Sequence, residues 1–253
     1  MRPIVLAVLP LTLFACTGKS DDSTSPGADA DTDTDTDSDT DADSDSDSDT
    51  DADADGPCPG YSGIGGVGTT WSWRTPDAYA QAYGYSSEWS QVVASITGDA
   101  IEITGQNTGE GDGYSTASTQ RQTIRCDADG AWVLTSQTSG STTFGSNVTT
   151  YSADVVYNPP ALYLPTGVGV GSTWATTYSA VQTDGDGVQT SYNFTVSSEL
   201  LAGGDVTVPA GTYATETWRQ VSTLGDGTPS DGSYNVSVGY VASEFAELTA
   251  YTP

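Results

Sequence analysis

Carboxylates carry the acid–base chemistry open to this chain, because it has no histidine and Lys19 is its single lysine. Without histidine, neither a Ser-His-Asp nor a Cys-His arrangement can form, and imidazole metal sites are excluded. Two paired carboxylates could still hydrolyse a glycosidic bond. The candidate glutamates, in or next to predicted strands, are Glu88, Glu102, Glu199, Glu216 and Glu244. No spacing singles out two of them, so we predict a protein that is not an enzyme, with a carboxylate-based glycoside hydrolase as the less favoured alternative.

Three other polar or glycine-rich patterns do not complete a ligand site. Residues 63–68 match the glycine spacing of dinucleotide sites, but a predicted strand follows where a helix amino terminus is needed. Residues 51–56 begin like a calcium loop, yet Ser62 stands where a carboxylate should complete the cage. Asp184 and Asp186, which are spaced by glycine, suit a hairpin turn. We therefore predict no cofactor and no metal site.

The three cysteines supply the other reactive groups. Cys16 follows an apolar stretch, residues 3–15, which is too short to cross a bilayer as a helix. Cys58 and Cys126 lie further along the chain. In an exported protein such a pair predicts a disulfide, with two free thiols as the alternative.

The order Leu13-Phe14-Ala15-Cys16 resembles the lipobox of bacterial lipoproteins. This resemblance implies a signal peptide over residues 1–15, cleavage before Cys16, and acylation of Cys16 by palmitate-type chains, which would hold the protein on a membrane. The alternative is an ordinary cysteine in a cleaved secretion signal. By analogy with enterobacterial sorting, Thr17 in place of aspartate favours the outer membrane, with the periplasmic face and the cell surface both left open.

Residues 16–56 are predicted to be a disordered tether. Residues 21–55 contain 16 aspartates and no basic residue, and like charges keep such a segment extended. Its composition resembles the tethers of envelope lipoproteins from deltaproteobacteria. The remaining body, residues 57–253, has 18 acidic residues against four arginines, a net charge of −14. This charge repels phosphate backbones, so we predict no nucleic acid partner.

The body is predicted to be all-β, with about a dozen strands in an antiparallel curved sheet, half-barrel or sandwich. Short segments rich in Val, Thr, Tyr and Trp alternate with Gly- and Asp-rich turns, and no long window keeps a helical period. The predicted strands are residues 69–74, 88–96, 100–104, 119–126, 131–137, 149–157, 173–182, 189–198, 205–208, 212–223, 233–241 and 245–251.

An internal repeat divides the body into two related halves, residues 66–160 and 168–253. The sequence Val-Gly-Thr-Thr-Trp at residues 67–71 returns as Val-Gly-Ser-Thr-Trp at residues 170–174. Together with Pro-Ala-Gly-Thr-Tyr at residues 209–213 and Val-Gly-Tyr-Val at residues 238–241, this pattern is similar to half-barrel envelope proteins related in shape to the lipoprotein carriers LolA and LolB. The resemblance implies an envelope fold and carries over no catalytic residue.

These observations predict a lipid-anchored cell-envelope protein that acts as a non-catalytic binding or interaction module. Its expected contacts are the membrane, through the lipid on Cys16, and an envelope protein, a polysaccharide or a lipid. The alternative is a carrier that shelters an apolar ligand in a concave sheet. A continuous apolar hollow would favour the carrier, and a filled interior would favour the interaction module.

Overall fold

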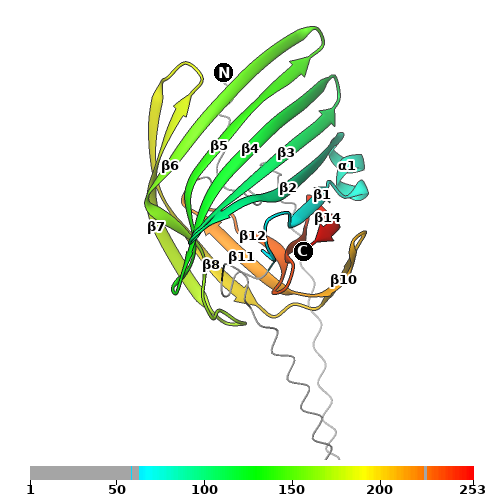
Figure 1. The fold of residues 1–253 in the computed structure, drawn as a ribbon. Coiled ribbons are helices and arrows are strands. Elements are labelled where there is room, and N and C mark those ends of the chain that lie inside the picture. Colours follow the sequence, from blue (N-terminus) through cyan, green and yellow to red (C-terminus); the bar gives the residue numbers. More distant parts are fainter. Residues whose placement is uncertain (1–57, 59–62, 225–226) are drawn as a thin grey trace, which may run out of the picture. The chain divides into compact units, whose positions relative to one another are not determined.

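The computed structural model describes Cys58, residues 63–224 and residues 227–253. The predictions for the signal peptide, Cys16 and the tether over residues 16–56 lie outside this part of the chain. Twelve of the described strands form one closed antiparallel barrel (Figure 1). The all-β prediction is therefore confirmed. The sequence allowed a curved sheet, a half-barrel or a sandwich, and the strands instead form a fully closed barrel.

The barrel is a meander in which neighbouring strands follow one another along the chain. One insertion interrupts it: β9 and β10 pair as a separate hairpin, so that β11 lies beside β8. Seven long strands of 12 to 19 residues are β2 (Tyr85–Thr97), β3 (Ala100–Gly111), β4 (Tyr114–Asp127), β5 (Gly130–Phe144), β6 (Asn147–Pro165), β7 (Thr173–Asp184) and β8 (Gln189–Leu201). Five short strands of 5 to 7 residues are β1 (Thr70–Arg74), β11 (Glu216–Ser222), β12 (Ser230–Asn235), β13 (Gly239–Ser243) and β14 (Ala246–Thr252). The hairpin consists of β9 (Asp205–Val208) and β10 (Gly211–Ala214).

Alternation of side chains along the strands separates a packed interior from a polar exterior. On β1 the indoles of Trp71 and Trp73 are buried, whereas Thr70 and Ser72 are half-buried on the opposite face. All six charged residues of β2, β3 and β4 lie on the outward face with Ser72: Glu88, Glu102, Glu110, Arg121, Arg125 and Asp127. Because successive strand residues point to opposite faces, this pattern places the polar side outward.

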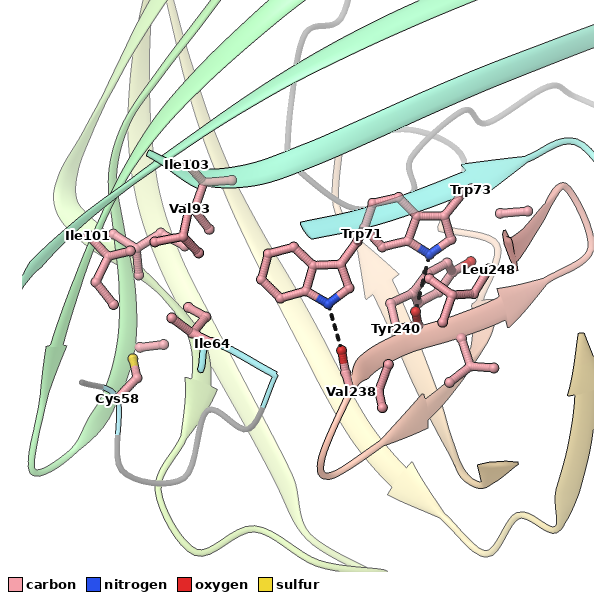
Figure 2. Close-up of a cluster of buried hydrophobic side chains, with 14 of the residues drawn as sticks. Cys58, Ile64, Trp71, Trp73, Val93, Ile101, Ile103, Val238, Tyr240 and Leu248 are labelled. Atoms are coloured by element: carbon pink, nitrogen blue, oxygen red, sulfur yellow. Dashed lines mark hydrogen bonds between the residues drawn. The ribbon is translucent and has the colours of Figure 1, made fainter. Parts of the chain in front are cut away.

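Two clusters of buried apolar side chains pack inside the barrel. The first joins β1 to β4 with β13, β14, Cys58 and Ile64, and includes Trp71, Ile101 and Leu248 (Figure 2). The second lies between β5 to β8 and the strands β11 and β12, and is largely aromatic. Its rings meet edge to face, as between Trp218 and Tyr234, whose centroids are 5.6 Å apart. This geometry favours aromatic packing.

The barrel has a weakly paired seam between β13 and β14. These two strands share only the registered pairs Ala242–Glu247 and Ser243–Ala246 next to their turn. Further along, the indole nitrogens of two tryptophans on β1 donate to backbone carbonyls of the β12–β13 segment, as Figure 2 shows. Side chains thus supply hydrogen bonds where the strand ladder does not continue.

The repeated Gly-Val-Gly-Thr/Ser segments form the same turn. In the first copy, Gly66 N–H donates to Thr69 Oγ1 at 3.0 Å and Thr69 N–H donates to Gly66 O at 3.2 Å. In the second copy, Gly169 N–H donates to Ser172 Oγ at 3.1 Å and Ser172 N–H donates to Gly169 O at 2.9 Å. Each turn then opens a run of six barrel strands, β1 to β6 and β7 to β14 without the hairpin.

The structure corrects several sequence-based boundaries. Helix α1 (Asp77–Tyr83), absent from the prediction, follows Pro76 and ends at Gly84, whose left-handed conformation caps it. The third predicted strand, residues 100–104, is too short, because β3 continues to Gly111. The predicted strand at residues 212–223 is divided at Thr215, since β10 pairs with β9 whereas β11 pairs with β8 and β12. The described part of the chain has no helix long and apolar enough to cross a membrane.

Candidate binding groove on strands β1 to β5

A groove of about 650 Å³ crosses five neighbouring strands, β1 to β5, on the outward face of the sheet. Two registered rows of side chains line it, one residue from each strand in each row. The first row is Thr70, Val92, Thr104, Arg121 and Gln137, and the second is Ser72, Ser90, Gln106, Thr119 and Ser139. The intervening row, whose side chains point inward, completes the floor with Gln91, Gly105, Gln120 and Thr138.

The groove is built almost entirely from hydroxyl and amide groups. Eleven of its 14 lining residues are Ser, Thr or Gln, and the others are Val92, Gly105 and Arg121. The hydroxyls of Thr119 and Ser139 are hydrogen-bonded to one another at 3.0 Å. Each such hydroxyl or amide side chain can both donate and accept. The lining therefore matches a ligand that has donors and acceptors of its own along its whole length.

The single charge in the lining is balanced by a neighbour. Arg121 Nη2 contacts Glu102 Oε2 on the adjacent strand, and both groups lie on the outward face. The Arg121 side chain is 57% exposed, and the pair carries no net charge. The groove is thus close to neutral on a body whose net charge is −14.

The barrel interior has no comparable room at its second cluster. A hollow lined by Tyr178, Ser198 and Gln220, among others, measures about 20 Å³. This volume holds a single water molecule and no acyl chain. Burial raises the pKa of the Tyr178 phenol above its ordinary value, which keeps that group neutral.

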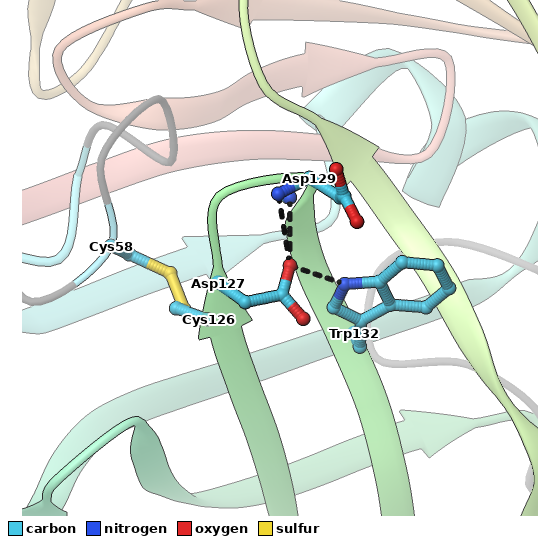
Figure 3. Close-up of a disulfide and its surroundings, with 6 residues drawn as sticks. Cys58, Cys126, Asp127, Asp129 and Trp132 are labelled. Atoms are coloured by element: carbon cyan, nitrogen blue, oxygen red, sulfur yellow. Dashed lines mark hydrogen bonds between the residues drawn. A yellow bond between two sulfur atoms is a disulfide. The ribbon is translucent and has the colours of Figure 1, made fainter.

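The predicted cysteine pair joins Cys58, the first described residue, to Cys126 on β4. Cys58 and Cys126 are both buried, with Cα atoms 5.2 Å apart, and the structure joins their sulfur atoms (Figure 3). This Cα separation suits a disulfide. The pairing connects the residue that follows the predicted tether to the end of β4.

A tight polar turn follows Cys126. Asp127 Oδ1 accepts hydrogen bonds from Trp132 Nε1 at 2.9 Å, from Asp129 N–H at 3.0 Å and from Gly130 N–H at 3.3 Å, as Figure 3 shows in part. The Trp132 hydrogen bond is the main cause that holds the pKa of the Asp127 carboxyl below its usual range. Arg125 Nη2 lies 3.3 Å from Asp127 Oδ2 and contributes in the same direction. Hydrogen bonds and an ion pair to Asp127 therefore hold the turn between β4 and β5, next to the cysteine pair. We call this set of interactions the Asp127 clamp.

The structure does not gather the carboxylates that the sequence offered for acid–base work. Glu88 is exposed on β2, Glu102 pairs with Arg121, and none of the five candidate glutamates lines the groove. Glu199 lies opposite Arg219 on β11, Glu216 opposite Tyr234 on β12, and Glu244 between β13 and β14.

The remaining motifs have structural roles. Asp184 Oδ1 accepts from Asp186 N–H and Val188 N–H, which confirms the hairpin turn between β7 and β8. Residues 63–68 lead by a turn into β1, as the sequence predicted. Across the described residues, no group of three or more Cys, Asp or Glu side chains could hold a metal ion.

Sequence reasoning missed the groove residues themselves. The predicted third strand ended at residue 104, so Gln106 fell outside every strand. A signal was nevertheless present. In β2, β3 and β4, polar residues continue at alternate positions past the part of each strand that carries apolar residues. No protein-family model, curated protein or solved structure matches this chain.

Proposed function

We propose that this chain is a lipid-anchored cell-envelope protein whose barrel binds an uncharged polysaccharide in the groove on strands β1 to β5, without catalysis. The observation that carries the proposal is the lining: eight of its ten outward-pointing side chains are Ser, Thr or Gln, and none of the lining residues is a carboxylate. Sugars present hydroxyls that both donate and accept, as these side chains do. Each well-formed hydrogen bond adds about 0.5–1.5 kcal/mol to affinity, so a long contact is needed, and five strands offer one.

The composition of the groove favours a glycan over the other partner classes. Protein interfaces rely on aromatic or aliphatic anchors, whereas Val92 supplies the one aliphatic side chain in the lining. A lipid or other apolar ligand needs an apolar hollow, and the interior hollow at Tyr178 holds about one water. An anionic polymer would be repelled by a body of net charge −14.

The envelope location rests on the lipobox resemblance at Cys16, which lies outside the described residues. A tether of some forty residues would let the barrel reach glycans at a distance from the lipid surface, since an extended chain spans up to about 3.3–3.6 Å per residue. Location and binding site are thus separate parts of the proposal and are tested separately.

The binding test uses the purified full chain and isothermal titration calorimetry with three hexasaccharides: cellohexaose, maltohexaose and hexagalacturonic acid. We expect the neutral cellohexaose or an equally neutral analogue such as maltohexaose to bind, and the anionic sugar not to bind. Gln106→Ala and Thr119→Ala should each weaken neutral binding by about three- to tenfold, because each removes a side-chain hydrogen bond.

The matched control is Thr108→Ala, on the same face of β3 as Gln106 but outside the lining. This variant should bind as the unchanged protein does. Failure of every neutral sugar to bind, or an equal loss in Thr108→Ala and Gln106→Ala, would overturn the proposal.

A further inference from the structure

The inward face of the long strands continues past the first core cluster as four registered rows. Each row takes one residue from β2, β3, β4 and β5 in turn. The rows are Gln91-Gly105-Gln120-Thr138, Trp89-Asn107-Ser118-Gly140, Ser87-Gly109-Thr116-Thr142 and Tyr85-Gly111-Tyr114-Phe144. On β6, Tyr151 lies beside Gly140 and extends the second row. We call these seventeen positions the inner aromatic face.

The inner aromatic face carries no charge. Every charged residue of β2, β3 and β4 lies on the other side of the sheet, and β5 has none. The inner aromatic face consists of hydroxyl, amide, glycine and aromatic residues only. This neutrality matches an uncharged ligand.

The tyrosines of this face lie over glycines of the neighbouring strands. A Cβ atom at Gly109 would come within 2.5 Å of Tyr85 Oη, and one at Gly140 within 2.7 Å of Tyr151 Oη. At Gly111 the ring of Tyr114 occupies the same space. The glycines therefore let the rings fold down onto the sheet instead of standing out from it. Rings held in this way are rigid and lose little freedom when a ligand stacks on them.

Two of these rings are nearly parallel to one another. The centroids of Tyr85 and Tyr114 are 5.9 Å apart and their planes differ by 9°. Both residues are half-buried, and Phe144, next to Tyr114 in the same row, is 65% exposed. The row thus presents aromatic surface to solvent beside the hydroxyls of Ser118 and Thr116.

The opposite wall of the barrel is too short to cover the last of these rows. The strands β1 and β11 to β14 have 5 to 7 residues, and β1 ends at Arg74, which is registered with Glu88. Beyond that point Thr75 still covers Ser87, which is buried, whereas Tyr85 and Tyr114 in the last row are half-buried and Phe144 is exposed. Figure 1 shows the long strands β2 to β6 rising past the short ones.

We propose that the inner aromatic face is a second sugar site, at which Tyr85, Tyr114 and Phe144 stack against the C–H faces of neutral sugar rings. Asn107, Ser118 and Thr116 would then receive the ring hydroxyls. The inference shares its ligand class with the proposed function, but the residues that it assigns to sugar binding lie outside the groove lining, on the other side of the same strands. Aromatic stacking with polar partners at the rim is the usual way for an amphipathic ring to hold an amphipathic ligand.

The test measures cellohexaose and maltohexaose binding to the full chain carrying Tyr85→Leu or Tyr114→Leu. Leucine keeps apolar bulk over the glycine but has no flat face. We expect a loss of about three- to tenfold in affinity for the leucine variants. Tyr85→Phe and Tyr114→Phe keep the ring and should restore binding to within about twofold. Tyr83→Leu, which changes a 57% exposed tyrosine on α1, is the matched control and should not change affinity.

A second measurement covers the case in which a leucine variant fails to fold. Tyrosine ring resonances of the unchanged chain, isotopically labelled and assigned with the phenylalanine variants, should shift for Tyr85 and Tyr114 when cellohexaose is added. Unchanged resonances, together with full affinity in folded leucine variants, would overturn the inference. Loss of binding in Gln106→Ala alone would then leave the groove as the sugar site, whereas loss in the tyrosine variants alone would uphold the inner aromatic face and reject the groove.

Discussion

Trp71 Nε1 donates a 2.8 Å hydrogen bond to the carbonyl oxygen of Val238, 167 residues away in the sequence. Two residues along β1, Trp73 Nε1 donates to Tyr240 O at 3.2 Å. Both indoles are buried, and both bonds lie where β13 and β14 have ceased to pair. Two side chains of β1 therefore supply hydrogen bonds at the weakly paired seam between β13 and β14. The hairpin assists there, because Ala210 N–H donates to Leu248 O on β14 at 3.2 Å.

Replacing Trp71 by phenylalanine should destabilise the barrel. The change retains most of the buried aromatic surface but leaves the Val238 carbonyl without this donor, at a cost of about 1–3 kcal/mol in the free energy of unfolding. Urea unfolding followed by circular dichroism measures the difference. Trp132→Phe, at a tryptophan that donates its hydrogen bond to Asp127 and not to the seam, should leave hydrogen exchange at residues 238–241 unchanged, whereas Trp71→Phe should accelerate it. Equal exchange in both variants would contradict the seam assignment.

Loss of the Cys58–Cys126 pairing should lower stability under oxidising conditions. A disulfide across 68 residues restricts the unfolded chain and typically contributes about 2–4 kcal/mol. The double variant with serine at both positions should therefore melt at a lower temperature than the unchanged chain. Adding dithiothreitol should lower the melting temperature of the unchanged chain alone. If the reductant has no effect on it, the two cysteines are not bonded in solution.

The Asp127 clamp should make stability depend on pH. Its pKa is held below the unfolded value of about 3.9, so the folded state binds fewer protons in this range. Its contribution is present above that unfolded value and is lost as the pH falls through the folded pKa. Asp127→Asn should thus lower the melting temperature at pH 7. The gap between the melting temperatures of the unchanged chain and this variant should narrow towards pH 2.5. Asp186→Asn, in an exposed turn, is the control; a gap for Asp127→Asn that widens on acidification would contradict the assignment.

Membrane attachment should depend on Cys16. If the lipobox resemblance holds, Cys16→Ala removes the acylated residue, and the protein should move from the membrane pellet to the soluble fraction of the envelope. Metabolic labelling with an alkyne palmitate analogue should mark the unchanged chain and not the variant. Cys58→Ala, which leaves the lipobox intact, should remain with the membranes. Continued sedimentation of Cys16→Ala would show that something other than this lipid holds the protein there.

Local sequence patterns predicted the strands well where alternation was strong. Trp71 and Trp73 stand at alternate positions, as do Ile101 and Ile103, and all four are buried on strands. Alternation weakens where strands leave the core, as at Gly105 and beyond on β3, and there the prediction stopped too early. An outer strand segment without an apolar face gives little periodic signal.

Long-range features could not be read from single segments. Closure of the barrel depends on β1 pairing with β14, for example Trp71 with Tyr251, and such pairing leaves no mark at either strand alone. The groove likewise depends on register across β1 to β5. By contrast, the repeated Gly-Val-Gly turn was visible in the sequence, because its Thr69 and Ser172 hydroxyls act on the backbone three residues away.

The position of the Cys58–Cys126 pair has a mechanical consequence. If residues 1–57 tie the barrel to a surface, tension in that segment reaches the fold at Cys58 and passes through covalent bonds into the end of β4. Strand β1, which lies in the loop between the two cysteines, then carries none of the load. Without the pair, the same pull would act on β1 and open its ladder with β14 one hydrogen bond at a time. The cysteine pair would thus let the barrel hold a bound ligand under shear without tension on the pairing of β1 with β14.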